Sequence, residues 1–120
     1  MTTHYLATRP QLLWGFSCAD RDCFRALGQT FIDTAPAWMG RLRLALGSGA
    51  AADICAASHG LKGMTQLVGA DAMTALLQEV ERRARADMPM PPLTALEPMF
   101  TQVMQEVAHS TLHYAGGDRL

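Results

Sequence analysis

The chain has 120 residues, of which 49% are apolar, so it is long enough for one domain with a hydrophobic core. Its formal net charge of −1 argues against a protein that binds nucleic acid through a basic surface. No run of about 18 apolar residues and no signal-peptide layout occur, so we expect a cytoplasmic protein without a membrane span. Three cysteines lack a metal-ligand spacing and are expected to be reduced and mostly packed: Cys18, Cys23 and Cys55.

The first 19 residues are predicted to form an arm or a short helix. Pro10 suits the first turn of such a helix, because a proline there loses no intrahelical hydrogen bond. Trp14 and Phe16, which follow closely, suggest a lid over one end of the core.

Two long helices are predicted next. The first begins after Asp20, whose carboxylate suits the N-cap position, and apolar residues then recur every three to four positions as far as Ala45. The second is predicted to begin at Ser48 or Gly49 and to end at Gly69, which suits a left-handed cap.

Two more helices complete the pattern. The third is predicted to begin at Asp71 as its N-cap, and the short turn before it implies an antiparallel packing on the second helix. A proline-rich loop, 87–92, precedes the last helix, for which Thr94–Glu97 fits a capping box. Gly116–Gly117 is predicted to end that helix.

These elements predict an all-α fold and a single domain over residues 1–120. Residues 20–114 form an up-down-up-down antiparallel four-helix bundle, residues 1–19 a short N-terminal extra helix or arm, and residues 115–120 a tail.

The second long helix carries the most informative residues. A helical wheel places an apolar set on one side, which can be buried: Ile54, Ala57, Leu61 and Val68. His59, Lys62, Gly63 and Gln66 fall together on the opposite, exposed side. Gly63 is unfavourable inside a helix, by roughly 1 kcal/mol relative to Ala, and we interpret it as clearance for a partner protein.

The exposed side suggests nucleophilic chemistry. A neutral imidazole such as that of His59 can attack phosphorus and hold the phosphoryl group covalently. Lys62 is the only lysine, against nine arginines, and can neutralise the phosphate, to which Gln66 can also donate a hydrogen bond. The sequence has no phosphate-binding loop and no carboxylate cluster for Mg²⁺, so we expect a phosphocarrier rather than an autonomous enzyme, with no cofactor of its own.

Two further groups remain open to more than one interpretation. Three arginines near the end of the third helix either pair with glutamates on a solvated face, as Glu79 with Arg83 and Glu81 with Arg85, or contact an acidic partner: Arg82, Arg83 and Arg85. His109 and His113, four positions apart, are either surface residues or metal ligands.

A longer string around the histidine resembles the pattern of the histidine-containing phosphotransfer (HPt) domain family. It reads His59-Gly60-Leu61-Lys62-Gly63, five further residues, then Gly69-Ala70. The family pattern has a hydroxyl residue where this chain has Gly60. The resemblance covers roughly Asp20 to Tyr114.

The resemblance implies a four-helix core with the phosphorylated histidine exposed in the middle of the second bundle helix. His59 would relay a phosphoryl group between phospho-aspartate receiver domains of hybrid sensor kinases and response regulators. The receiver would supply Mg²⁺, and the chain would be a monomer. Partner contacts are expected at Cys55, Ala56, Gly63, Met64 and Arg82. The alternatives left open are a receiver-binding adaptor that sequesters regulators or kinases without phosphotransfer, and a structural or metal-binding bundle.

Overall fold

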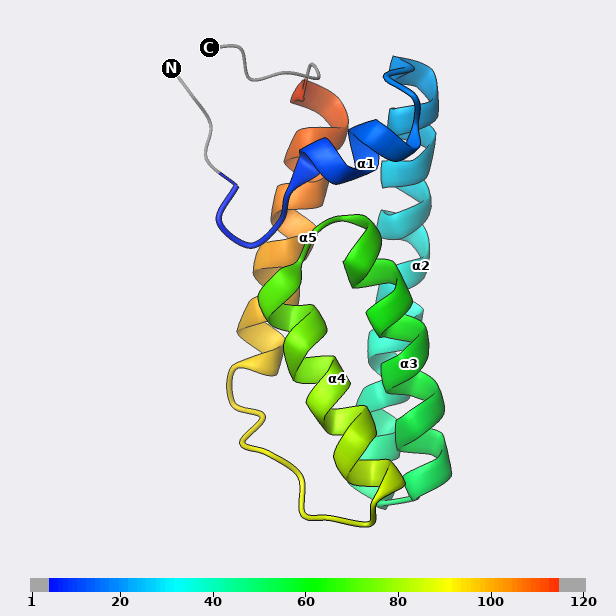
Figure 1. Ribbon diagram of the computed structural model, residues 1–120, viewed down its shortest axis with the longest axis vertical. Coiled ribbons are helices and arrows are strands. Elements are labelled where there is room, and N and C mark those ends of the chain that lie inside the picture. The colour runs from blue at the N-terminus through cyan, green and yellow to red at the C-terminus, as the bar shows by residue number, and fades with distance from the viewer. Residues whose placement is uncertain (1–4, 115–120) are drawn as a thin grey trace.

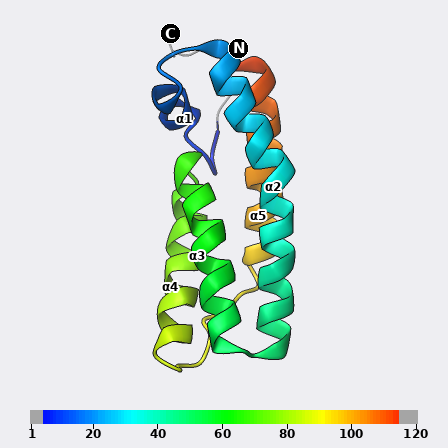
Figure 2. The same cartoon turned by 90° about the vertical axis from the view of Figure 1, so that its right-hand side faces the viewer.

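The computed structural model describes residues 5–114, which form five α-helices and no strand. These are α1 (Pro10–Phe16), α2 (Arg21–Ser48), α3 (Ala51–Leu67), α4 (Asp71–Arg85) and α5 (Leu96–His113). The four longer helices lie side by side, and α1 crosses one end of them (Figures 1 and 2). The prediction of an all-α fold is therefore confirmed, and the short N-terminal helix is present.

The start of α2 follows the sequence prediction, but its end does not. The Asp20 carboxylate accepts a hydrogen bond from the Cys23 amide at 3.0 Å, as expected of an N-cap. The predicted helix start at Ser48 or Gly49 is wrong, because α2 continues through Ser48. Gly49 then ends it with a φ of 76°, and α3 begins at Ala51.

The turn between α3 and α4 also differs from the prediction in one respect. Gly69 takes the predicted left-handed conformation, with a φ of 68°. Asp71 is the first residue of α4 and does not cap it, since Ala70 occupies the N-cap position without a side-chain hydrogen bond. The Asp71 carboxylate instead pairs with the Arg9 guanidinium at 2.8 Å.

The predicted capping box of the last helix is wrong. Ala95 holds the N-cap position of α5, with no side-chain hydrogen bond to the helix. The carboxylate of Glu97 pairs instead with Arg43 of α2, and this links the two helices. The described helix ends at His113, and the predicted stop at Gly116–Gly117 lies outside the described residues.

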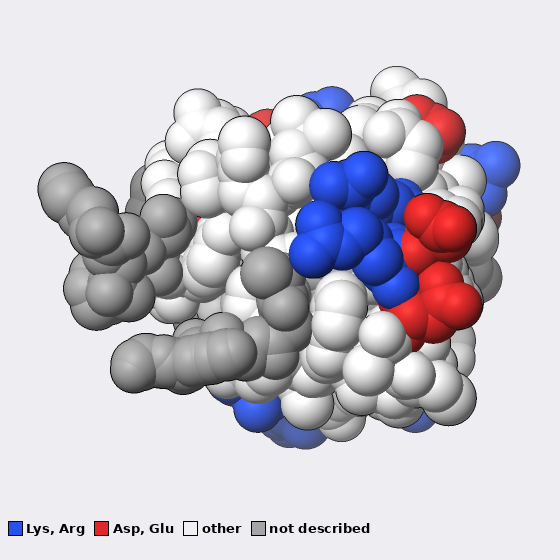
Figure 3. Space-filling model, turned by 90° about the horizontal axis from the view of Figure 1, so that it is seen from above, with Lys and Arg blue, Asp and Glu red and all other residues white. Residues whose placement is uncertain are grey.

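The core runs along the length of the bundle and draws on all four long helices. The largest of its fully buried apolar side chains are Phe24, Met39, Leu42, Leu61, Met73, Leu77, Val80, Val103 and Val107. In α1, Leu13 is buried, and the Trp14 ring packs edge-on against Phe24 with centroids 5.3 Å apart. Seen from this end, the most prominent charged group is a basic cluster beside acidic side chains, and other charged side chains lie around the rim (Figure 3).

The cysteines differ from the expectation in their packing. All three thiols are free, but Cys18 and Cys23 are exposed and only Cys55 is partly buried. Cys18 lies just before α2 and Cys23 lies in its first turn, whereas Cys55 belongs to α3. None of the helices in residues 5–114 combines the length and apolar character needed to cross a membrane.

Residues 6–9, here called the N-terminal strap, connect α5 to the α3–α4 turn. The Glu106 carboxylate is 6% exposed and accepts hydrogen bonds from three successive strap amides at 2.9–3.1 Å. The Arg9 amide donates to the Val68 carbonyl at 2.9 Å. Any Cβ at Gly69 would lie 2.6 Å from the Arg9 Cβ, so the strap crosses the turn where only glycine fits.

Candidate functional site

The structure separates the four residues predicted to share the exposed side of α3. The His59 side chain is 70% exposed, and Gly63 and Gln66 are also exposed. The Lys62 side chain is only 13% exposed, so its predicted free exposure is wrong. Its long stem carries the ammonium group towards α4, where it finds a buried carboxylate. The opposite side is buried as predicted: Ile54, Ala57, Leu61 and Val68.

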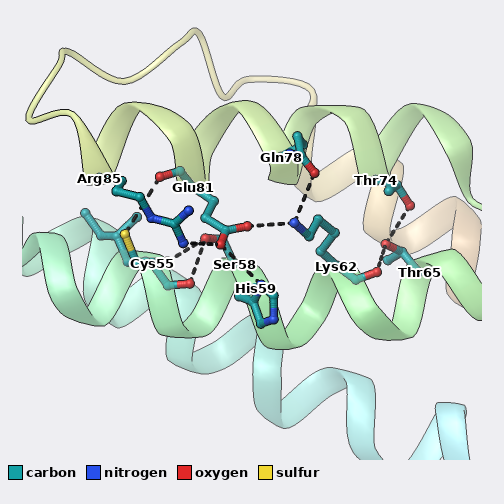
Figure 4. A network of polar contacts seen from close by, with 10 residues as sticks. Cys55, Ser58, His59, Lys62, Thr65, Thr74, Gln78, Glu81 and Arg85 are labelled. Carbon is teal, nitrogen blue, oxygen red and sulfur yellow. Dashed lines mark hydrogen bonds and ion pairs between the residues drawn. The ribbon is translucent and has the colours of Figure 1, made fainter.

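One carboxylate on α4 joins the charged groups of this site (Figure 4). The Glu81 side chain is 6% exposed and lies between the two helices. Its Oε2 is 3.2 Å from Nδ1 of His59 and accepts a hydrogen bond from Arg85 at 2.7 Å. Its Oε1 accepts a hydrogen bond from Lys62 at 2.8 Å. A buried carboxylate thus contacts the exposed imidazole and holds two further basic side chains, Lys62 and Arg85, beside it.

Neighbouring polar contacts fix α3 against α4 along the same line (Figure 4). The Lys62 ammonium also donates to Oε1 of Gln78 at 3.0 Å. The hydroxyl oxygens of Thr65 and Thr74 lie 2.8 Å apart, one from each helix. The Ser58 hydroxyl donates to the Ile54 carbonyl within α3 at 2.6 Å. These bonds hold the backbone that carries the imidazole.

The position of Glu81 determines which nitrogen of His59 is available. The hydrogen bond from Lys62 lowers the pKa of Glu81 below its ordinary value, so the carboxylate is ionised at neutral pH. An ionised carboxylate only accepts hydrogen bonds, so the proton between the two groups belongs to Nδ1. In the neutral ring, Nε2 then keeps its lone pair.

The charges around the imidazole leave a positive balance. Lys62 and Arg85 contribute two positive charges against the single negative charge of Glu81. The Arg85 side chain is 70% exposed, so its guanidinium can follow an incoming anion. A phosphoryl group on His59 would therefore meet a site with net positive charge.

A substitution of Glu81 tests this arrangement. We expect Glu81→Gln to slow phosphorylation of His59 by about ten- to hundredfold, as for other groups that orient a reacting or ligating imidazole. Quench-flow measurement of phosphohistidine formation gives the rate. The matched control is Glu79→Gln, because Glu79 lies on the same helix and contacts Arg82 and Arg83 instead. Equal rates for the two variants would contradict a role for Glu81.

The control residue, Glu79, is also ionised, but through hydrogen bonds from other side chains. Hydrogen bonds from Arg82, which has the larger effect, and from Arg83 lower the pKa of Glu79 to about 2. The predicted pairing of Glu79 with Arg83 and of Glu81 with Arg85 is confirmed. The arginine cluster is therefore largely neutralised within α4, which favours the interpretation as a solvated face.

Sequence reasoning missed the central role of Glu81 and treated it only as a partner of Arg85. A signal was present, since Glu81 follows Leu77 by four positions and precedes Ala84 by three. It therefore lies on the buried stripe of α4, and a buried carboxylate requires a partner. Lys62, the only lysine of the chain, was the available cation on the facing helix.

Gly60 has a steric reason that the sequence did not provide. Any Cβ at this position would lie 2.5 Å from the Trp38 ring, so the indole of α2 packs directly on the α3 backbone. At Gly63, by contrast, an added Cβ would meet nothing within 4 Å. The two glycines thus differ in their surroundings. The space beside Gly60 is occupied by the Trp38 ring, whereas the space beside Gly63 is open.

The residues expected to contact a partner lie on different sides of α3 and, for Arg82, on α4. Ala56 is exposed, whereas Met64 is partly buried and lies 3.9 Å from the Thr34 hydroxyl. The Cys55 thiol lies near the Glu81 carbonyl, facing α4. Arg82 donates to Glu79.

The two histidines of α5 lie at the strap end of the molecule, apart from this site. Their rings are 4.6 Å apart, and Nδ1 of His109 is 2.8 Å from the Tyr5 hydroxyl. Within residues 5–114, no third metal-ligating side chain is placed to join His109 and His113.

Comparison with known families identifies the class of this domain. The Hpt domain model matches residues 26–109, well over half of the chain, and includes His59 and the whole α3–α4 hairpin. The chain belongs to the Hpt domain family, whose members take part in histidine phosphotransfer in two-component systems. The resemblance found from the sequence is thereby confirmed. Neither a curated protein nor a solved structure matches the chain.

Proposed function

We propose that this chain is a phosphorelay intermediate that carries a phosphoryl group on His59 between phospho-aspartate receiver domains of hybrid sensor kinases and response regulators. The observation that carries the proposal is the exposed imidazole whose Nδ1 lies 3.2 Å from the buried Glu81 carboxylate. The course of the chain in Figure 1 supports an up-down-up-down antiparallel bundle as its scaffold. We place this monomeric phosphocarrier in the cytoplasm.

The groups around His59 suggest how the phosphoryl group is transferred. The Nε2 lone pair of His59 attacks the phosphorus of the partner's phospho-aspartate, and the bond from phosphorus to the aspartate oxygen breaks. The aspartate leaves as a carboxylate, and the ring acquires positive charge while Nδ1 keeps its proton. Glu81 stabilises that charge, much as a carboxylate supports an imidazolium in other catalytic sites.

The remaining predicted residues have supporting roles. Lys62 and Arg85 lie where they can shift from Glu81 towards the phosphoryl oxygens, and Gln66 is exposed one turn beyond Lys62. Mg²⁺ held by the acidic cluster of the receiver would neutralise charge on the transferring group.

Gly63 offers a test of partner access that leaves the fold intact. We expect Gly63→Gln to raise the free energy of unfolding by roughly 0.5–1 kcal/mol, because the helix loses a glycine. It should nevertheless slow transfer from a receiver, because the new side chain occupies open space one turn from His59. Gly47→Gln is the matched control, since an added Cβ there also meets nothing within 4 Å. Fast transfer to the Gly63 variant would contradict the clearance role.

Phosphotransfer profiling tests the function itself. The purified chain is mixed with phosphorylated receivers from the same genome, and acid-labile, alkali-stable label on the chain is measured over time. We expect label to appear as it leaves one or more receivers. The adaptor alternative predicts that receivers bind while no label reaches the chain.

A further inference from the structure

Three residues of α2 form a surface beside the imidazole, here called the α2 ridge: Trp38, Arg41 and Leu44. Trp38 is partly buried, and the other two are exposed. The Leu44 side chain is 78% exposed, although it is large and apolar. The Arg41 guanidinium carbon lies 4.5 Å from the centroid of the Trp38 ring, as in a cation–π contact. The ridge therefore combines apolar area with a positive charge held in place by the indole.

Contact with Gly60 places this ridge next to His59. A Cβ added at Gly60 would lie 2.5 Å from the nearest atom of the Trp38 ring. The ring therefore occupies the space that any side chain at this position would need. Because Gly60 directly follows His59, the indole lies against the backbone next to the phosphoryl acceptor. The residue at which this chain departs from the family pattern is thus the one that admits the ring.

A groove of about 620 Å³ extends from the ridge along α3 and is also lined by Asp53 and Ala56. Arg41 makes no ion pair with a carboxylate anywhere in the described part of the chain. On the α4 side of the site, by contrast, the arginines are already paired with Glu79 and Glu81. Charge complementarity therefore favours a partner that brings a carboxylate to Arg41.

We propose that the α2 ridge selects the receiver, by taking an apolar patch of that domain between Trp38 and Leu44 and pairing a receiver carboxylate with Arg41. This inference rests on the proposed function and assigns partner recognition to α2 rather than to the arginines of α4. Tryptophan and arginine are the residue types that dominate interface energetics, particularly when grouped around a pocket.

Calorimetric titration with a receiver chosen by profiling tests the ridge without the chemistry. The chain carries His59→Gln, so that docking is measured in the absence of transfer. We expect Leu44→Ala and Arg41→Glu each to weaken the affinity by about tenfold, the change typical of a contributing interface residue. Leu112→Ala is the matched control, because Leu112 is 64% exposed on α5, and it should bind like the parent.

A second readout separates docking from reaction. With His59 restored, the maximal transfer rate at saturating receiver should stay within about twofold of the wild-type rate, as expected when only uniform binding is lost. Phosphorylation of His59 by phosphoramidate, which needs no partner, should be unchanged.

Unaltered affinity in both ridge variants would overturn the inference. It would also be overturned if sedimentation equilibrium showed a wild-type dimer that Leu44→Ala converts to a monomer, because the ridge would then bind a second copy of this chain. If no receiver binds at all, both the inference and the proposed function fail. If the ridge variants weaken docking but wild-type His59 never becomes phosphorylated, the inference stands and phosphotransfer fails.

Discussion

Replacing His59 by glutamine should abolish phosphorylation of this chain by a phosphorylated receiver. We expect the rate to fall by at least about a thousandfold, because loss of a nucleophile removes the covalent step itself. The fold should survive, since the imidazole is 70% exposed and packs against no apolar core. The free energy of unfolding should change by less than about 1 kcal/mol, because the imidazole is exposed and Lys62 and Arg85 still pair with the Glu81 carboxylate.

Two histidines of α5 provide matched controls for this substitution. His109→Gln and His113→Gln remove exposed imidazoles from the same four-helix scaffold, far from Glu81. Both variants should be labelled at the wild-type rate in a radiolabel transfer assay. Persistent labelling of the His59 variant, or loss of labelling in the His109 variant, would move the acceptor away from α3.

Replacing Glu106 by glutamine should lower the free energy of unfolding by about 3 kcal/mol, the largest stability effect we expect outside the apolar core. The carboxylate accepts bonds from the strap amides, from the Thr8 hydroxyl at 2.8 Å and from Gln102 at 2.8 Å. A carboxamide offers only one acceptor oxygen and turns an N–H group towards those donors. Urea unfolding measures the difference, and the melting temperature should fall by about 10 °C.

Glu97→Gln is the matched control, because Glu97 lies on the same helix but forms an exposed ion pair with Arg43. We expect a change of less than about 1 kcal/mol in that variant. Comparable destabilisation by the two substitutions would contradict the assignment of Glu106 as the anchor of the strap.

The effect of Glu106 should depend on pH in a defined direction. Burial alone would raise the pKa of Glu106, but the hydrogen bonds from Gln102, Thr8 and the strap amides lower it below the ordinary value of 4.5. The ionised group therefore stabilises the fold above that value, and this contribution is lost as the pH falls through the lower folded pKa. The difference between wild type and Glu106→Gln should be constant near neutral pH and shrink in acid.

The apolar spacing was sufficient to predict the helices and their buried stripes. Local signals for helix ends were less reliable, because tertiary contacts competed for the same side chains. Asp71 and Glu97 both looked like helix-start residues, but each pairs with an arginine from a distant part of the chain. Asp20, which has no such competitor, caps α2 as predicted.

The candidate site was predictable only as far as a single helix determines it. The wheel of α3 placed His59 and Gly63 on the exposed side, in agreement with the structure. The wheel could not show that Lys62 turns to α4, because that depends on the facing helix. Glu81 and Trp38 come from two other helices, so their contacts with α3 follow from packing and not from local sequence.

The most direct test of this account is the identity of the phosphorylated atom. The ¹⁵N-histidine-labelled chain is phosphorylated by a receiver, and couplings between phosphorus and the imidazole nitrogens are measured by NMR. We predict phosphorus on Nε2 of His59, with Nδ1 still protonated and facing Glu81. Phosphorus on Nδ1 of His59, or on any other residue, would contradict it.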